Sequence, residues 1–479
     1  MSVNTPRRDV TQQPTILQPE SVSSPSLEYM KMQEDWLLGI DLWGGTKAMR
    51  KRSTRWLPQE EGESDKAYNA RLNKTFLYNG YKSTIQRLAG QVFYQPVQVE
   101  NVPPELEYLE HDFDSEGHSI TEVAHQLLEK MLRFGKTHGI MDYPSGTSDL
   151  SHWEEKELKI RPYFTEVDPR DLIAWRHKTI GGFQQLEQIR VQEFSIEPYN
   201  EFQEIETYRV RVFYPDRVDV HVLRVNDGEE SYELEDSIPF TLGEIPLTTA
   251  YAAKTGFLVA EPPLNDLAWL NLRHWQSTSD QNTILHVARV PIFFAKGFRE
   301  GELQATTLGA YKGISTTNQD ASLEYIEHTG RAIGAGENDL EKLKKEMHEI
   351  GADLLVSRSV DRQTASARSI DRAESLSMLQ TMVLSLTRML ENCYELAGKW
   401  IGVDASGVSV TIGSEFSVPV SANPVDDLKA LGLSDEDMLK EAKRRGILDQ
   451  SVENISPKKK ETSPQQGVQS EEEQLEGTD

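Results

Sequence analysis

The strongest constraint on the fold is a pair of helical patterns between Asn338 and Trp400, separated by a polar segment. In the first pattern, apolar residues recur at alternating steps of three and four, which is typical of a helix that packs against one other helix. The second pattern continues for about nine helical turns, well beyond an average globular helix, so it needs a large partner surface. The first stripe consists of Leu340, Leu343, Met347, Ile350 and Leu354, and the second of Ile370, Ala373, Leu376, Leu379, Val383, Leu386, Leu390, Cys393, Ala397 and Trp400.

The polar segment between the two helices is Ser357–Ser366. It carries two arginines and one aspartate, and its apolar residues are Val360 and Ala365. If such a segment were buried, many of its polar groups would lack hydrogen-bond partners. We therefore expect it to face solvent, as a loop displayed between two helices.

Acidic residues dominate the chain. Over 479 residues, 77 Asp and Glu stand against 51 Lys and Arg, and the net charge is −26. Proteins that grip DNA are usually basic, so this chain should repel a polyanion except at local basic clusters. No apolar run reaches the roughly 18 residues of a membrane span, and the polar first 27 residues do not resemble a secretory signal. We expect no membrane association.

The single cysteine, Cys393, lies on the apolar stripe of the long helix. This position predicts a small core residue rather than a catalytic thiol. One cysteine cannot form an internal disulfide, which fits a reducing cytoplasm.

Other helices are indicated by apolar periodicity and by their end signals. Residues 28–56 are predicted to be mostly helical, and Ile120–Phe134 forms an amphipathic helix that Gly135 ends. Pro262-Pro263 opens a further helix that runs to residue 290, because proline is favoured in the first helical turn.

Strand patterns dominate residues 161–250. Apolar residues alternate with polar ones there, and Asn226-Asp227-Gly228 is a strong hairpin signal, so we predict an antiparallel meander. Short strand-like pieces follow within 291–335, and another strand is predicted at Val408–Ile412. Strands in a meander combined with long helices give an α+β fold class.

The residue patterns that support enzyme chemistry are not found. Gly135-Lys136-Thr137 resembles the end of a phosphate-binding loop, but Lys130 stands where the earlier glycine is required, and the segment runs from helix to strand. His348-Glu349 is not followed by the second histidine of a zinc protease. We therefore predict no catalytic, cofactor-binding or metal-binding residues, and a protein that is not an enzyme.

Several segments, in their order along the chain, resemble tailed-bacteriophage portal proteins, in particular a group often described only as a phage family of unknown function. The resemblance covers roughly residues 65–400 and rests on the order of modest motifs and on the succession of helix, compact module, helix, loop and long helix. The matching segments are Tyr68-Asn69-Ala70-Arg71-Leu72, Gly90-Gln91-Val92-Phe93, Arg133-Phe134-Gly135, Met141-Asp142-Tyr143-Pro144, Asp168-Pro169-Arg170-Asp171-Leu172-Ile173-Ala174-Trp175-Arg176, Leu270-Asn271 to Asp280-Gln281, and Ala365-Ser366-Ala367-Arg368.

The resemblance implies a homo-oligomeric ring, usually of twelve subunits, at one capsid vertex of a virion, assembled in the host cytoplasm. Double-stranded DNA would enter through the ring during packaging and leave through it at infection. The implied partners are the terminase, a head–tail adaptor protein, and the major capsid and scaffold proteins.

The resemblance also implies a portal-protein fold: a helical wing with an antiparallel β part, a two-helix stem, a small α/β clip, a long wing helix and a small helical crown. The first and last segments match nothing in the family, and their composition predicts disorder. The implied parts are an N-terminal arm at 1–27, the wing at 28–261, stem helix 1 at 262–290, the clip at 291–336, stem helix 2 at 337–356, a tunnel loop at 357–366, the long wing helix and strands at 367–420, the crown at 421–455 and an acidic tail at 456–479.

In a portal-type ring, the polar segment becomes the tunnel loop and the first apolar stripe becomes the stem packing. The arginines of this region either touch passing phosphates or pair with nearby carboxylates, and both readings stay open. An acidic wall elsewhere would keep DNA affinity low. The candidate channel residues are Arg358, Ser359, Asp361, Arg362, Gln363, Thr364 and Arg368.

Two other functions are considered. One is a different structural protein of the virion, such as a head–tail connector or a minor capsid protein, although connectors are usually much smaller and lack a double stem. The other is a nuclease-like enzyme with clustered carboxylates, which a metal-dependent cleavage assay would reveal.

Overall fold

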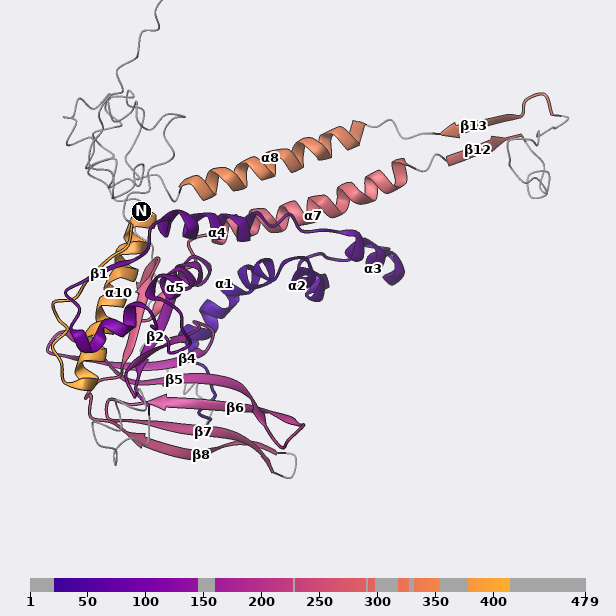
Figure 1. Ribbon diagram of the computed structural model, residues 1–479. Helices are drawn as coiled ribbons and strands as arrows, with labels where there is room; N and C mark the ends of the chain where they lie inside the picture. Colours follow the sequence, from indigo (N-terminus) through magenta and orange to yellow (C-terminus); the bar gives the residue numbers. More distant parts are fainter. Residues whose placement is uncertain are drawn as a thin grey trace, which may run out of the picture. The chain divides into compact units, whose positions relative to one another are not determined.

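The computed structural model describes residues 21–144, 160–226, 229–289, 292–297, 318–326, 331–353 and 378–413. All of them belong to one compact unit, Met1–Phe416. The predicted tunnel loop, crown and acidic tail lie outside the described residues, as does most of the predicted arm. The described part is a mixed fold of helices and antiparallel sheets (Figure 1), so the α+β class is confirmed.

Side-chain caps begin several of the helices. Ser26, Ser64 and Asn79 each accept a hydrogen bond from a backbone N–H in the first turn that follows, and Ser119 forms a reciprocal capping box with Glu122. Such caps satisfy amides that have no partner within the helix. The helices are α1 Leu27–Trp43, α2 Gly45–Lys51, α3 Asp65–Lys74, α4 Gly80–Val92, α5 Ile120–Phe134, α7 Asn265–Ala288, α8 Arg331–Asp353 and α10 Met378–Ile401, with the 3-10 turns η1 Ser53–Arg55 and η2 Pro104–Glu110.

The predicted helix at Ile120–Phe134 has the predicted bounds. Gly135 ends it with a φ of 82°, a conformation that favours glycine. A Cβ at this position would lie 2.3 Å from the carbonyl oxygen of Glu261. Gly135 therefore permits both the turn into the next strand and a close approach of two backbones.

The predicted meander is confirmed as a five-stranded antiparallel sheet in the order β4-β5-β6-β7-β8. Strands β7 and β8 pair up to Asn226 and Glu229, on either side of the predicted hairpin turn. The strands are β4 Leu172–Ile180, β5 Phe183–Pro198, β6 Glu204–Phe213, β7 Arg217–Asn226 and β8 Glu229–Pro239.

The remaining strands form smaller antiparallel sheets. In the three-stranded sheet β2 lies between β3 and β9, and the predicted strand near residue 410 pairs with β1. The bounds are β1 Gln98–Glu100, β2 Lys136–Asp142, β3 Tyr163–Val167, β9 Leu247–Tyr251, β10 Lys254–Gly256, β11 Val259–Ala260, β12 Ile292–Lys296, β13 Ser322–Ile326 and β14 Ser409–Thr411.

The long helix α10 crosses the three-stranded sheet and α5 (Figure 1), which supply the large partner surface that its stripe requires. The indole Nε1 of Trp400 donates to the Met141 carbonyl at 2.8 Å. Cys393 is fully buried, and burial raises the pKa of its thiol to about 12. Cys393 is thus a core residue, as predicted.

Lys136 begins β2 and is fully buried. Its ammonium donates to the Leu258 carbonyl at 2.6 Å and lies 4.8 Å from the centroid of the Trp175 ring. Burial lowers the pKa of Lys136 from 10.5 to about 7. Its side chain therefore belongs to the core and is not exposed to a phosphate.

We predict that Lys136→Met changes the pH dependence of stability. The folded pKa of Lys136 is lowered, so between about pH 7 and 10.5 the unfolded state binds the extra proton, and wild-type stability rises with pH across this window. Below pH 7 the cost of burying the charge is fully present. The variant should therefore unfold at a higher temperature than wild type at pH 6, with an advantage that shrinks by pH 9.

Thermal unfolding at both pH values measures this difference. Lys31→Met, on the exposed surface of α1, is the matched control and should show no such dependence. If Lys136→Met raised the unfolding temperature equally at pH 6 and pH 9, the assignment of a lowered pKa to Lys136 would be contradicted.

Candidate functional site

Helices α7 and α8 run side by side and form a two-helix unit (Figure 1). Asp339 of α8 accepts hydrogen bonds from Arg273 and Ser277 of α7 at 3.5 and 3.2 Å. Further along, the amide of Gln281 donates to the Ile333 carbonyl at 3.0 Å. A Cβ at Gly336 would lie 1.9 Å from Oε1 of Gln281, so the two helices approach closely there because one residue is glycine.

A buried amide joins the two-helix unit to the rest of the fold. Asn271 of α7 has no exposed surface. Its Oδ1 accepts from the Tyr81 backbone N–H, and its Nδ2 donates to the Tyr78 carbonyl, both at 2.8 Å. A single side chain thus bridges α7 and the beginning of α4.

The apolar stripe of α8 packs against two helices, not one as its spacing predicted. It contacts α7 and also α4, where a Cβ at Gly80 would lie 3.1 Å from Sδ of Met347. A Cβ at Gly351 would lie 2.7 Å from the Thr84 side chain of α4. A narrow stripe is enough to pack on both α7 and α4, because α4 contacts only the C-terminal part of α8.

The predicted stem-packing residues differ in burial. Leu343 and Met347 are buried, Leu340 and Ile350 are half-buried, and Leu354 lies outside the described residues. The middle of the stripe is therefore its most enclosed part.

Strands β12 and β13 form an antiparallel hairpin between α7 and α8, with Ile292 opposite Ile326. The strand pieces predicted here are confirmed. Helix α8 begins at Arg331, before the predicted boundary at residue 337. The prediction was late because glycine usually marks a loop, whereas Gly334 and Gly336 lie inside this helix. Helix α7 begins at Asn265, after the two prolines that were expected to open it.

The candidate channel residues lie outside the described residues, so their role stays a prediction from the sequence. They are Arg358, Ser359, Asp361, Arg362, Gln363, Thr364 and Arg368.

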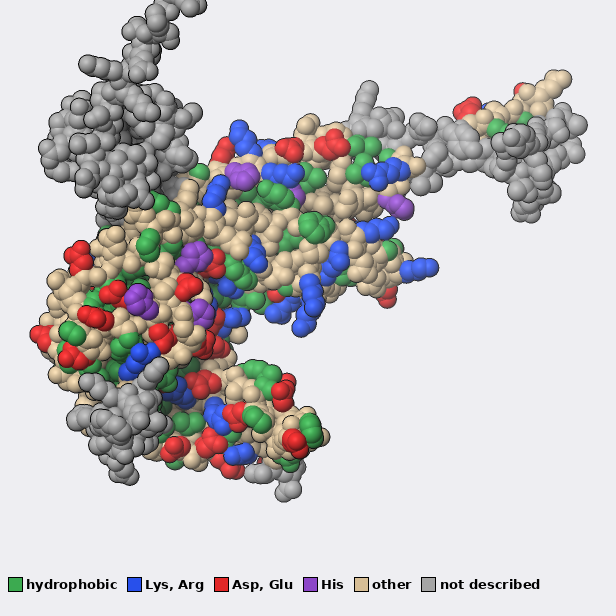
Figure 2. All heavy atoms as spheres, viewed as in Figure 1, with side chains coloured by type: hydrophobic (Ala, Val, Ile, Leu, Met, Phe, Trp, Pro, Cys, Tyr) green, Lys and Arg blue, Asp and Glu red, His purple; other side chains and the backbone are tan. Residues whose placement is uncertain are grey.

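The sequence analysis missed a basic segment in α2 and η1. Five cations lie between Lys47 and Arg55, with no acid among them. Figure 2 shows Lys and Arg side chains gathered over α2 and α3. Arg50 is engaged, donating to the Asn73 and Thr75 carbonyls at 2.7 and 2.9 Å. A local count of charge along the chain would have detected this segment, which the net charge of −26 conceals.

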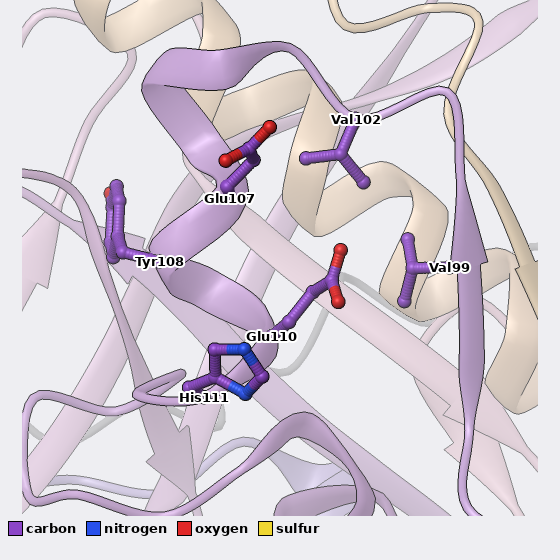
Figure 3. Close-up of a pocket in the computed structure, with 6 residues that line it drawn as sticks. All are labelled: Val99, Val102, Glu107, Tyr108, Glu110 and His111. Carbon is purple, nitrogen blue, oxygen red and sulfur yellow. The ribbon is translucent and has the colours of Figure 1, made fainter.

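A pocket with a volume of about 450 Å³ lies beside η2, lined by Val99, Val102, Glu107, Tyr108, Glu110 and His111. Figure 3 shows Glu107 and Glu110 projecting from η2 towards the two valines. The Tyr108 hydroxyl donates to the Pro162 carbonyl at 2.6 Å, so it is not an activated nucleophile. The pocket supports no particular reaction.

One group of potential metal ligands occurs within the described part of the chain: Asp114, Glu116 and His118. The Asp114 carboxylate already accepts from the backbone N–H groups of the other two residues, and it pairs with His118 Nδ1 at 2.6 Å. That hydrogen bond raises the pKa of His118. These bonds close the turn before α5, and they explain the cluster without an ion.

The described residues define an α+β protein with a two-helix unit that carries a β-hairpin. Among the described helices, none is both long and apolar enough to cross a lipid bilayer. A family model described as "Domain of unknown function (DUF4055)" matches residues 263–401, from the start of α7 to the end of α10. A search of the curated proteins finds no match.

Two solved structures with similarity come from gene transfer agent (GTA) particles. The "Neck of empty GTA particle computed with C6 symmetry" has 12% identity and a TM-score of 0.40, over 75% of this chain and 88% of that chain. The "Virion of native gene transfer agent (GTA) particle" has 11% identity and a TM-score of 0.38, over 84% of this chain and 96% of that chain. These likenesses are remote and assign no activity to this chain.

We predict that Leu343→Ala destabilises the protein by about 2–5 kcal/mol, the usual cost of emptying a buried leucine site. Leu343 is buried where α8 packs on its neighbours. The half-buried Leu340 on the same helix is the matched control, and Leu340→Ala should cost clearly less. Chemical denaturation at fixed protein concentration measures both. Equal losses in the two variants would mean that the packing is not centred on Leu343.

Proposed function

We propose that this chain is a structural subunit of a phage-type head–tail assembly, specifically a portal protein without catalytic activity. Copies would form a ring at one capsid vertex, through which double-stranded DNA is packaged and ejected. The observation that carries the proposal is the order α7, hairpin β12–β13, α8 and then the long α10, which returns to the core.

This order suits a ring subunit for a physical reason. A closed ring needs two different faces on each subunit, which meet head to tail. The parts of α7 and α8 that stay exposed are available to neighbouring copies. The exposed side of α8 is rich in charge, with i,i+4 pairs Lys342–Glu346 and Lys345–Glu349, and such a polar face is compatible with an assembly that forms from soluble subunits.

In the proposed ring, α7 and α8 form the stem and the β12–β13 hairpin belongs to the clip, which would dock the terminase during packaging and a head–tail adaptor afterwards. The elements from α1 to β11 form the wing together with α10. The major capsid and scaffold proteins would surround the ring in the assembling particle.

The charge of the chain agrees with a conduit. Each phosphate that a protein neutralises adds salt-dependent affinity for DNA, and a channel that bound DNA tightly would obstruct its passage. A net charge of −26 for each subunit would on average repel DNA instead of binding it. DNA would then slide past the wall without being held there.

We predict that the purified full-length protein forms rings with an axial hole, about twelve subunits in each. Negative-stain electron microscopy and light scattering measure the shape and the mass. A protein that stays monomeric across a wide range of salt and protein concentrations would refute the proposal. Metal-dependent cleavage of DNA by the pure protein would favour an enzyme instead.

We also predict that Arg358→Glu combined with Arg362→Glu leaves ring formation intact and lowers the yield of packaged DNA. The added negative charge would repel DNA at the proposed tunnel loop. The control is Lys31→Glu combined with Lys254→Glu, exposed on α1 and β10, which makes the same change in charge outside the loop and outside the stem. Packaging by the arginine variant at the wild-type level would remove the channel role of these arginines.

A further inference from the structure

Association between copies of this chain faces an electrostatic problem. Each copy carries a net charge of −26, so two copies repel each other at a distance. A stable contact between them must bring surfaces of opposite local charge together, because like charges across an interface cost several kcal/mol. The described residues contain one surface of each sign, and each surface also exposes aromatic side chains.

The first surface, here called the basic surface, consists of α2, η1, residues 73–77 and Trp269 of α7. Thr46 and Arg50 of α2 bind the backbone at Leu77 and at Asn73 and Thr75, so the end of α3 lies directly beside α2. The exposed side chains of this surface include Lys47, Lys51, Arg55, Lys74, Phe76 and Trp269, together with Arg52, which pairs with Asp41.

Aromatic groups lie among these cations. Phe76 is 69% exposed and Trp269 is 53% exposed. The Trp269 ring packs edge-to-face on Trp56, with centroids 6.4 Å apart, and the Arg55 guanidinium lies 5.2 Å from the same Trp56 ring. Exposed aromatic side chains and arginine are enriched at protein interfaces, and the lysines around them would lie at the rim.

The second surface, here called the sheet tip, is the part of the five-stranded sheet around the β5–β6 loop. Phe194 and Tyr208 face each other across β5 and β6, with ring centroids 5.1 Å apart, and both are exposed. Phe202 in the loop is 88% exposed. Ile196 is exposed on the same face of the sheet as Phe194, and Tyr199 is exposed just after β5. Exposed apolar side chains gathered on one surface mark an interaction site.

Acidic side chains surround the apolar part of the sheet tip. Glu201, Glu204 and Glu206 lie in and beside the β5–β6 loop, and Glu229 and Glu230 lie at the start of β8; all are exposed. The nearby cations Arg209 and Arg224 both pair with Glu235, and Arg209 also pairs with Glu197. The sheet tip is therefore acidic and aromatic, and Figure 2 shows acidic and hydrophobic side chains mixed at the ends of β6–β8.

We propose that the sheet tip of one copy docks on the basic surface of a second copy. This inference rests on the proposed function and specifies a contact that would join neighbouring subunits of the ring. The two surfaces have opposite charge and come from different parts of the chain, as a head-to-tail contact requires. DNA fits the basic surface less well, because it would leave the apolar side chains of the sheet tip uncovered.

The test reverses the charge of each surface in the full-length protein. The basic-surface variant is K47E/K51E/K74E and the sheet-tip variant is E201K/E204K/E230K. Each alone brings like charges together, so the protein concentration needed for half-assembly should rise about tenfold or more. A chain that carries all six substitutions should assemble again, because the two surfaces are once more opposite in charge, whereas a folding defect would not be rescued.

The control is K31E/R176E/K254E, which makes the same change in net charge as the basic-surface variant, at exposed residues of other elements, and should assemble like wild type. Light scattering measures assembly, and a titration with a short DNA duplex runs in parallel. Normal assembly of both single-surface variants would overturn this inference, and so would a loss of assembly in the control equal to that in the variants. The proposed function would still stand in either case, provided that the wild-type protein forms rings. A monomeric wild type would instead refute the proposed function. Loss of duplex binding in the basic-surface variant with assembly unchanged would show that the basic surface binds DNA, and would also overturn the inference.

Discussion

One buried amide, alongside the bonds that Gln276 and Ser279 of α7 make, holds the two-helix unit against the rest of the fold. Asn271 accepts from the Tyr81 backbone N–H and donates to the Tyr78 carbonyl at the beginning of α4. Without Asn271 the Tyr81 N–H would be buried with no partner, at a cost of about 1–3 kcal/mol. An apolar side chain of similar size could fill the space but could not hold two backbone groups at fixed angles. Because α8 packs on both α7 and α4, the contact between α7 and α4 through Asn271 also helps to fix the position of α8.

Other polar residues of the motifs quoted from the sequence have comparable structural roles. Arg71 forms a two-pronged pair with Glu63 and also donates to Ser279 of α7 at 3.3 Å. Asp168 pairs with Arg170 and Lys130 before β4. These side chains fasten α3 to α7 and α5 to the strand that follows. These motifs therefore hold elements of the fold together, which explains how they can be informative about the fold.

The sequence predicted those elements whose signals are local. Ile120–Phe134 has a capping serine, an apolar stripe and a terminal glycine, and the meander has period-two alternation with a hairpin turn. Contacts between elements distant in sequence were harder to predict. The spacing of Leu343 and Met347 gives the width of a stripe but not the number of helices that cover it, and Gly336 looks like a loop residue until Gln281 of α7 is seen packed against it. The candidate channel arginines lie outside the described residues, and the basic segment from Lys47 to Arg55 was concealed by the net charge.

A conduit for DNA has two requirements that conflict. Its subunits must bind one another although they share the same charge, and the finished ring must not hold the DNA that passes through it. Separating charge into local surfaces meets both requirements. If the acids of the sheet tip cover Lys47 and Lys51 of a neighbouring copy, these cations contribute to assembly and are no longer available to phosphates. The ring then presents mainly its acidic surplus to DNA, so the contact that builds the channel would also keep its affinity for DNA low.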